Sequence, residues 1–431
     1  MEPEPHLTAL LERLVERCDP AVIDAGAIVR RAQRQRARRA AALVIVVALA
    51  MGGAVIAAHD GRPEHVTTNP PTTAAATTTV PSMGATEVAT GRWSTTTAPA
   101  ALRSRAGALV VWAGDRLVVW GGDDVGSHRH LSDGETFDPR SGRWTPMAEG
   151  PLAATDGGTA VWSGELVYVL GSDGIAATYD PVADRWHALW QAPVSGRVVA
   201  VWTGTEVVVV GTDDHVAALR PGNHGNNRWH RLPDVPFTGV VDQLAAVWSR
   251  GRVVVARAGS HLVERGSGAP GLRFAALDPR TGRWVTRFEG PAPTGLTTMF
   301  PTAGGVLVPG AVPYCPAAAS CPFEDPGPGA ELDLATGAWT HIARGPADDA
   351  HGLDAWTGAA LLHVSASAES GARHLRVGQA AIWDAAGNRW VPVADGPATE
   401  AAAAVWTGRE VLVWDESDAD DGADVLRRFG P

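Results

Sequence analysis

The segment LVVWAGDRLVVWGGDDVGSHRHLSDGETFDPRSGRW, residues 109–144, contains the two patterns on which the fold of this 431-residue chain depends. The first pattern is a short apolar run that ends at Trp112, a small turn and a second run rich in β-branched residues. The second pattern is Phe137 and Asp138, a turn, and then Trp144. Each pattern predicts two antiparallel strands joined by a tight turn.

Both patterns recur along the chain. The first returns around Trp162, Trp202, Trp248, Trp356 and Trp406, and FPTAGGVLVPG near Ala303 is a copy without its Trp. The last residue of the second pattern is a Trp that recurs every 42 to 55 residues and marks the structural repeat. These residues are Trp93, Trp144, Trp186, Trp229, Trp284, Trp339 and Trp390. Seven units of four strands at this period predict an all-β fold, a seven-bladed β-propeller over residues 91–431.

The two ends of the repeat region complement each other. Residues 91–93 read GRW, the closing half of a second pattern that has no opening half. Residues 425–431 read VLRRFGP, an opening half that has no Trp. We therefore expect the strand at Trp93 to complete the last blade as its outermost strand and so to close the ring.

An apolar strand that ends in Gly-Gly, followed by an aromatic residue and a Trp seven positions later, resembles the kelch motif. The motif is matched by Gly121, Gly122, Phe137 and Trp144. Later copies match less closely, and in the next unit Ser172 replaces the second Gly. The resemblance implies a propeller that serves mostly as a binding platform and only sometimes as an enzyme.

Kelch-like propellers include galactose oxidase, and that resemblance would imply a copper site built from Tyr and His. The chain has three Tyr, of which Tyr179 is the aromatic residue of its repeat and Tyr168 lies in a predicted strand. We therefore predict no catalytic residue and no cofactor. A propeller enzyme with an unrecognised site remains the alternative.

Composition separates the chain into two parts of opposite charge. The net charge is −11, and this acidic balance argues against a nucleic-acid partner. The first 58 residues carry 8 Arg and 6 carboxylates, so the remainder carries −13. Thirteen of the 17 Trp occupy the two repeat positions, which indicates core packing.

Residues 40–58 are nineteen uncharged residues, enough for a transmembrane helix of about 28 Å. Six Arg precede them between Arg30 and Arg39, which predicts a cytoplasmic N-terminus and a single-pass cell-membrane protein with an extracytoplasmic propeller. A cleaved signal peptide is the competing interpretation. Residues 59–90 are rich in Thr and Pro and predict an extended linker.

The cytoplasmic segment, residues 1–39, begins with an amphipathic pattern at residues 7–17. Such a helix can lie on the membrane or dock a cytoplasmic partner. The layout also resembles bacterial transmembrane anti-sigma regulators, whose zinc-type His and Cys spacing is absent because His6 and Cys18 stand alone.

Cys315 and Cys321 stand in a Pro-rich stretch of the predicted external domain. An oxidising exterior favours a disulfide between them, which would staple a loop of the fifth blade. A metal site with two Cys ligands is the alternative.

Carboxylates gather where we expect the loops of one face of the propeller. They suggest a ligand face for a cation, a basic peptide or a cell-wall component, although solvated loops of any acidic protein would look the same. The residues are Asp123, Asp124, Asp213, Asp214, Asp348, Asp349 and Asp354. ESDADDGAD at 416–424 has the composition of a calcium loop without its register, and it predicts at most a weak calcium site.

Together these features predict a membrane-anchored, non-catalytic binding or sensor module that recognises a protein or cell-envelope ligand outside the membrane.

Overall fold

The computed structural model describes residues 90–99, 102, 104–124, 127, 129–152, 158–221, 228–237, 243–258, 273–289, 298–309, 329–343, 351–368, 375–376, 380–393, 401–415 and 424–430. The predicted cytoplasmic helix, transmembrane helix and linker lie outside these residues and stay predictions. Within these ranges, no helix is both long and apolar enough to cross a membrane.

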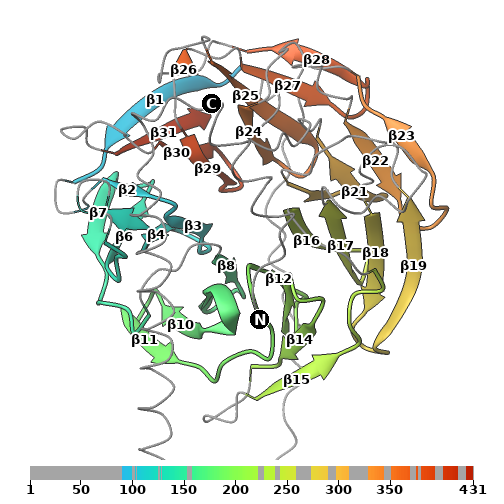
Figure 1. Ribbon diagram of the computed structural model, residues 1–431. Helices are drawn as coiled ribbons and strands as arrows, with labels where there is room; N and C mark the ends of the chain where they lie inside the picture. The colour runs from blue at the N-terminus through green and yellow to red at the C-terminus, as the bar shows by residue number, and fades with distance from the viewer. Residues whose placement is uncertain are drawn as a thin grey trace, which may run out of the picture. The chain divides into compact units, whose positions relative to one another are not determined.

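Seven antiparallel sheets of four main strands form the blades of a propeller, so the predicted all-β, seven-bladed fold is confirmed (Figure 1). Blade 1 contains β3 (Leu109–Trp112), β4 (Leu117–Trp120), β6 (Gly134–Asp138) and β7 (Arg143–Pro146). Blade 2 contains β8 (Thr159–Trp162), β9 (Val167–Leu170), β10 (Ala176–Asp180) and β11 (Arg185–Ala188). Blade 3 contains β12 (Val198–Trp202), β13 (Val207–Gly211), β14 (Val216–Leu219) and β15 (Trp229–Leu232).

The remaining blades follow the same order along the chain. Blade 4 contains β16 (Gln243–Ser249), β17 (Arg252–Ala258), β18 (Arg273–Asp278) and β19 (Arg283–Glu289). Blade 5 contains β20 (Phe300–Pro301), β21 (Gly305–Val308), β22 (Ala330–Asp333) and β23 (Trp339–His341). Blade 6 contains β24 (His351–Trp356), β25 (Ala360–Ala368), β27 (Ala380–Asp384) and β28 (Arg389–Pro392).

Blade 7 is assembled from both ends of the repeat region. It contains β29 (Ala401–Trp406), β30 (Val411–Asp415), β31 (Val425–Gly430) and, as its outermost strand, β1 (Arg92–Thr97). Trp93 lies opposite Phe429 in the β1–β31 register. The predicted closure of the ring is therefore confirmed, and Figure 1 shows β1 running beside β31.

Short elements lie outside the four main strands of the blades. β2 (Arg105–Ala106) pairs with β5 (Asp123–Asp124), β26 (Leu375–Arg376) pairs with β25, and η1 (Ser172–Gly174) is a turn of 3-10 helix.

The apolar core lies between the blades. Seven clusters of buried side chains fill the seven seams, and each cluster draws its residues from two neighbouring blades. At the seam of blades 7 and 1, Trp414 and Leu426 of blade 7 pack with Leu117 and Phe137 of blade 1. The alternation of apolar residues on both sides of each strand thus serves two seams at once.

The antiparallel order of each blade separates the connections into two sets. The hairpins between strands one and two and the turns between strands three and four lie on one side of the propeller, which we call the hairpin face. The loops between strands two and three and the connections between blades lie on the opposite side, which we call the loop face.

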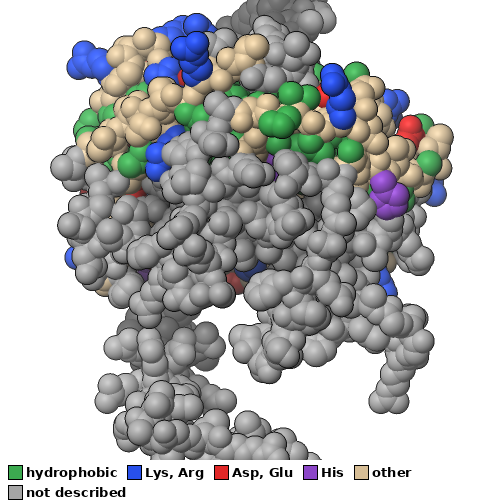
Figure 2. Space-filling view, turned by 90° about the horizontal axis from the view of Figure 1, so that it is seen from above, with side chains coloured by type: hydrophobic (Ala, Val, Ile, Leu, Met, Phe, Trp, Pro, Cys, Tyr) green, Lys and Arg blue, Asp and Glu red, His purple; other side chains and the backbone are tan. Residues whose placement is uncertain are grey.

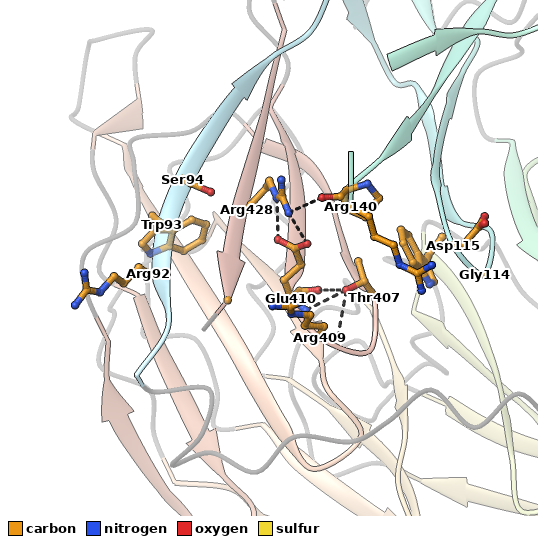
Figure 3. A pocket seen from close by; sticks show the side chains of 13 residues that line it. Arg92, Trp93, Ser94, Gly114, Asp115, Arg140, Thr407, Arg409, Glu410 and Arg428 are labelled. Atoms are coloured by element: carbon orange, nitrogen blue, oxygen red, sulfur yellow. Dashed lines mark hydrogen bonds and ion pairs between the residues drawn. The ribbon is translucent and has the colours of Figure 1, made fainter. Parts of the chain in front are cut away.

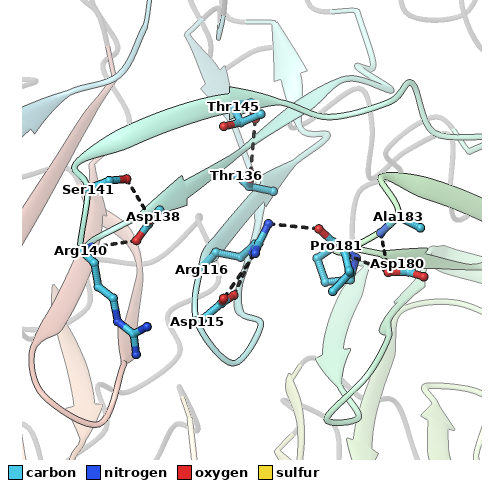
Figure 4. A network of polar contacts seen from close by, with 11 residues as sticks. Asp115, Arg116, Thr136, Asp138, Arg140, Ser141, Thr145, Asp180, Pro181 and Ala183 are labelled. Carbon is cyan, nitrogen blue, oxygen red and sulfur yellow. Dashed lines mark hydrogen bonds and ion pairs between the residues drawn. The ribbon is translucent and has the colours of Figure 1, made fainter.

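Turns of the hairpin face are built by Asp. In blade 1 the Asp138 carboxylate accepts hydrogen bonds from the Arg140 backbone N–H at 2.8 Å and the Ser141 hydroxyl at 2.7 Å (Figure 4). These bonds, the Ser141 bond first, hold the pKa of Asp138 below its ordinary value. Gly142 takes a φ of 67°, which a residue with a side chain rarely adopts.

Candidate functional site

The predicted ligand face of carboxylates is only partly assembled by the structure. Asp123 and Asp124 form β5 on the loop face, as expected. The Asp123 carboxylate lies 2.6 Å from the His130 Nδ1, and the Asp124 carboxylate accepts a bond from the Ser127 backbone N–H at 2.7 Å. Both side chains therefore stabilise their own loop.

Asp213 and Asp214 follow β13 on the loop face and also make local contacts. Asp213 accepts a bond from the His215 backbone N–H at 3.2 Å. Asp214 forms an ion pair with Arg257, whose side chain is 2% exposed and also donates to the Gly211 carbonyl at 3.0 Å. Arg257 comes from blade 4, so this ion pair joins blades 3 and 4.

The prediction that Asp354 lies in a loop of this face is wrong. Asp354 stands within strand β24, opposite His363 of β25, and its side chain is only 7% exposed. Its carboxylate lies 2.9 Å from the His363 Nδ1. The apolar alternation on either side of Asp354 is that of a strand, and the His363 partner explains how a carboxylate is tolerated there.

Several predicted site residues lie outside the described residues. Asp348, Asp349, Cys315, Cys321 and most of the 416–424 segment are among them. The disulfide and the weak calcium site stay predictions. Among the described residues, no group of three or more His, Cys, Asp or Glu is arranged to hold a metal ion.

The two described Tyr belong to the core. Tyr168 is 2% exposed, and burial raises its pKa to about 12. The Tyr179 hydroxyl donates to the Asp184 carboxylate at 2.9 Å, and burial followed by this bond raises its pKa. Both phenols therefore stay protonated at neutral pH, in structural roles.

A buried charged group lies on the loop face where the chain passes from blade 7 to blade 1. Arg105, with a fully buried side chain, donates to the Gly121 carbonyl at 3.0 Å and lies 3.2 Å from the Asp133 carboxylate. Glu135 on β6 is 4% exposed, and its Oε2 has no hydrogen-bond partner among the described residues. The pKa of Glu135 is raised overall, mainly by burial. Arg105 lowers it in part, and Asp133 raises it further. Sequence patterns do not reveal such a group.

The hairpin face contains a pocket of about 740 Å³ at the seam of blades 7 and 1 (Figure 3). Five stretches of the chain line it: the start of β1, the β3–β4 hairpin, the β6–β7 turn, the β29–β30 hairpin and the end of β31. Four of the lining residues are Arg, namely Arg92, Arg140, Arg409 and Arg428, and two carry carboxylates, namely Asp115 and Glu410.

Both carboxylates of the pocket are bound by Arg. Arg428 Nε and Nη2 each lie 2.8 Å from a different oxygen of Glu410, a bidentate arrangement that raises the pKa of Arg428. The same guanidinium donates to the Pro139 carbonyl of blade 1 at 3.0 Å. Asp115 is bound by its neighbour Arg116 at 2.8 Å.

The Arg116 and Arg428 side chains connect neighbouring blades in the same way. Arg116 donates to the Pro181 carbonyl of blade 2 at 3.1 Å (Figure 4). Arg428 donates in the same way to the Pro139 carbonyl of blade 1. Each Arg thus neutralises a carboxylate and holds a turn of the next blade by a hydrogen bond. These two Arg have structural roles.

The other three Arg of the pocket have no such partners. Within the described residues, no ion pair or side-chain hydrogen bond engages the guanidinium of Arg92, Arg140 or Arg409, and all three residues are exposed. Arg is common elsewhere on the hairpin face too. Figure 2, which views the molecule at 90° to Figure 1, shows several Arg side chains along the upper margin of the coloured residues. Other Arg in or beside turns of this face are Arg143, Arg185, Arg250, Arg252, Arg280, Arg283 and Arg389, of which Arg250, Arg280 and Arg389 have partners.

This pocket was not predicted, because the carboxylates of the loops, and not the Arg of the turns, were taken as the signal of a binding site. The signal was present in DPRSG at residues 138–142 and TGRE at residues 407–410. Their convergence depends on the closure of the ring, which brings residues more than 260 positions apart together.

A comparison with protein-family models agrees with the fold. A family model described as Kelch motif matches residues 104–151, which contain blade 1. The match and the seven blades together support a kelch-repeat propeller. The crystal structure of the Myceliophteria thermophila Cps50 (Swd1) beta-propeller domain is similar over 78% of this chain and 98% of that chain, with 14% identity and a TM-score of 0.49. No curated protein matches the chain.

Proposed function

We propose that this chain is a non-catalytic binding module, a kelch-like propeller that is anchored to the cell membrane through residues 40–58 and recognises a protein or cell-envelope ligand outside the membrane. The observation that carries the binding role is the pocket at the seam of blades 7 and 1, whose five lining stretches are held by the closure of the ring. Concave sites of this size commonly receive ligands.

The fold supports binding because the scaffold is rigid and the turns of the pocket are short. The β29–β30 hairpin is held by Thr407, whose hydroxyl donates to the Glu410 carbonyl at 2.9 Å and accepts from the Glu410 backbone N–H at 3.0 Å. Loops positioned by rigid strands are where propellers and other β-folds place their recognition residues.

The membrane anchor and its orientation rest on the sequence alone. The uncharged stretch 40–58 and the Arg cluster before it favour a propeller on the side away from the cytoplasm. The short segment 1–39 would then pass a signal or a tether to the inner side of the membrane.

Topology and binding are tested separately on the full chain. Protease added to intact bacterial cells that produce the chain with a C-terminal epitope should remove the epitope, whereas an epitope at the N-terminus should survive until the membrane is permeabilised. Survival of the C-terminal epitope on intact cells would refute the orientation. For binding, the full chain in detergent micelles should be retained by washed cell envelopes more than an unrelated single-pass protein, and equal retention would refute a ligand in the cell envelope.

A further inference from the structure

We propose that the pocket at the seam of blades 7 and 1 binds the anionic group of its ligand, a phosphate or a carboxylate, through the guanidiniums of Arg140 and Arg409. This inference rests on the proposed binding function and names the chemistry of its ligand. Neither the resemblance to kelch repeats nor the predicted acidic ligand face assigns this site.

Electrostatics favour an anion. The four Arg and two carboxylates leave the lining residues with a net formal charge of +2. Arg428 already neutralises Glu410, and Arg116, from the same hairpin, neutralises Asp115. The field inside the pocket therefore comes from Arg92, Arg140 and Arg409, in a molecule whose overall charge is −11.

Hydrogen-bond supply points the same way. A guanidinium carries five N–H donors in a planar fork that matches carboxylate and phosphate oxygens. The bonds of Arg140 and Arg409 to the rest of the described structure are made by their backbone, from Arg140 N to the Asp138 carboxylate at 2.8 Å and from Arg409 N to the Thr407 hydroxyl at 3.3 Å. Their backbones are thus fixed while their side-chain donors remain available.

The two Arg approach from different blades. Arg140 belongs to the β6–β7 turn of blade 1 and Arg409 to the β29–β30 hairpin of blade 7, and Figure 3 shows them on either side of the Thr407 and Glu410 side chains. The Arg428 bonds to Glu410 and to the Pro139 carbonyl hold the two turns in register. An anion between them would be contacted from both blades.

The remaining wall suggests what accompanies the anionic group. Trp112 lines the pocket and is half-buried, since part of its ring packs in the core cluster of the same seam. An aromatic wall beside cationic side chains suits a ligand that joins a phosphate or carboxylate to a ring with an apolar face, such as a sugar phosphate or a uronic acid.

The test is titration calorimetry of the full chain in detergent micelles with glucose 6-phosphate, glucuronate and glucose, because these probes share a ring and differ in charge. We expect binding of at least one anionic probe, no binding of glucose, and an affinity that falls as NaCl rises from about 50 to about 500 mM. The inference would be overturned if glucose bound as tightly as both anions, or if neither anion bound at about 10 mM. The anion that binds more tightly shows whether the site prefers a phosphate or a carboxylate.

Arg280 provides the matched control. It occupies in the DPRTG turn of blade 4 the position that Arg140 occupies in blade 1, and its side chain is 88% exposed and outside the pocket. Arg140→Gln and Arg409→Gln should each weaken anion binding about fivefold or more, and Arg280→Gln should leave it unchanged. An equal effect of all three substitutions would contradict the assignment. All three positions are exposed, so unchanged melting temperatures verify the fold.

The result separates this inference from the proposed function. If washed envelopes retain the Arg140→Gln and Arg409→Gln variants as well as the original chain, the pocket assignment is wrong and the binding role stands. If envelopes retain neither the original chain nor the variants while glucose 6-phosphate still binds, the envelope ligand is wrong and the anion site stands.

Discussion

At the scale of single residues, the Trp of the outermost strands do more than fill the core. The indole N–H groups of four of them donate to a backbone carbonyl of the preceding blade at 2.7 to 3.1 Å, from Trp186 to Ala148, Trp229 to Trp190, Trp284 to Pro233 and Trp390 to Ala343. The repeat predicted these Trp as core residues. It could not predict the hydrogen bonds, because these depend on how neighbouring blades are placed.

Replacing Trp186 by Phe should test this bond between blades. The change keeps an aromatic ring beside Tyr179 and Trp120 but leaves the Ala148 carbonyl without its 2.8 Å donor. We expect a loss of about 1 to 2 kcal/mol in the free energy of unfolding, measured by denaturant titration. Trp190→Phe is the control, since that side chain is 71% exposed and should change stability by less than about 0.5 kcal/mol. Equal stabilities of the two variants would show that the indole bond contributes nothing.

Glu135 leads to a prediction about pH. Burial raises its pKa, so the folded protein binds this proton more tightly than the unfolded chain does, and ionisation of Glu135 opposes folding. The stability that the protonated form contributes is complete below the ordinary pKa of 4.5 and is lost as the pH rises through the raised value. Glu135→Gln should therefore melt at a higher temperature than the original protein at about pH 7, and the difference should shrink towards about pH 4. A lower melting temperature of the variant at neutral pH would mean that attraction to Arg105 outweighs the cost of burial.

At the scale of strands, the turn patterns predicted the antiparallel pairing, and the structure adds the register. In all seven blades the residue that opens the second pattern lies directly opposite its Trp, as Phe137 does with Trp144 and Phe429 with Trp93. In five blades the two residues are seven positions apart, and a turn of fixed length sets this register. Blade 3 has a longer connection, and blade 7 pairs the two ends of the repeat region. The position of Asp354 was mistaken because a single carboxylate within an apolar run resembles a loop residue until its His363 partner is known.

The closing strand β1 should be essential to the fold. Trp93 packs on Phe429 with ring centroids 4.8 Å apart and contacts the core between blades 6 and 7. Trp93→Ala should lower the free energy of unfolding by about 3 kcal/mol, measured by thermal or denaturant unfolding. Ser94→Ala on the same strand is the control and should have an effect below about 0.5 kcal/mol, because Ser94 is exposed. An unchanged stability of Trp93→Ala would contradict the role of β1.

At the scale of the whole molecule, the number of blades followed from the repeat and the pocket did not. Seven copies at a regular period require seven seams, and seven core clusters fill them. The pocket depends on five stretches of chain from residue 92 to residue 430 that meet only when the ring is closed. Local patterns describe neighbours along the chain, whereas this site is made by neighbours across the seam.

The closed ring is the central claim, because the last blade and the pocket both depend on it. Thr95 lies directly opposite Arg427 in the β1–β31 register, and neither side chain belongs to the core. A variant with Thr95→Cys and Arg427→Cys, and with its three own Cys replaced by Ser, should form an intramolecular disulfide under mild oxidation. The measurement is the mobility of the unfolded chain on a non-reducing gel, which the cross-link between distant positions should shift strongly.

The control pairs Thr95→Cys with Arg185→Cys, on the outermost strand of blade 2, and it should form no intramolecular cross-link. We predict that the Thr95 and Arg427 pair cross-links nearly completely and that the control pair does not. Failure of the Thr95 and Arg427 pair to cross-link, or equal cross-linking of both pairs, would contradict a propeller closed by β1 beside β31.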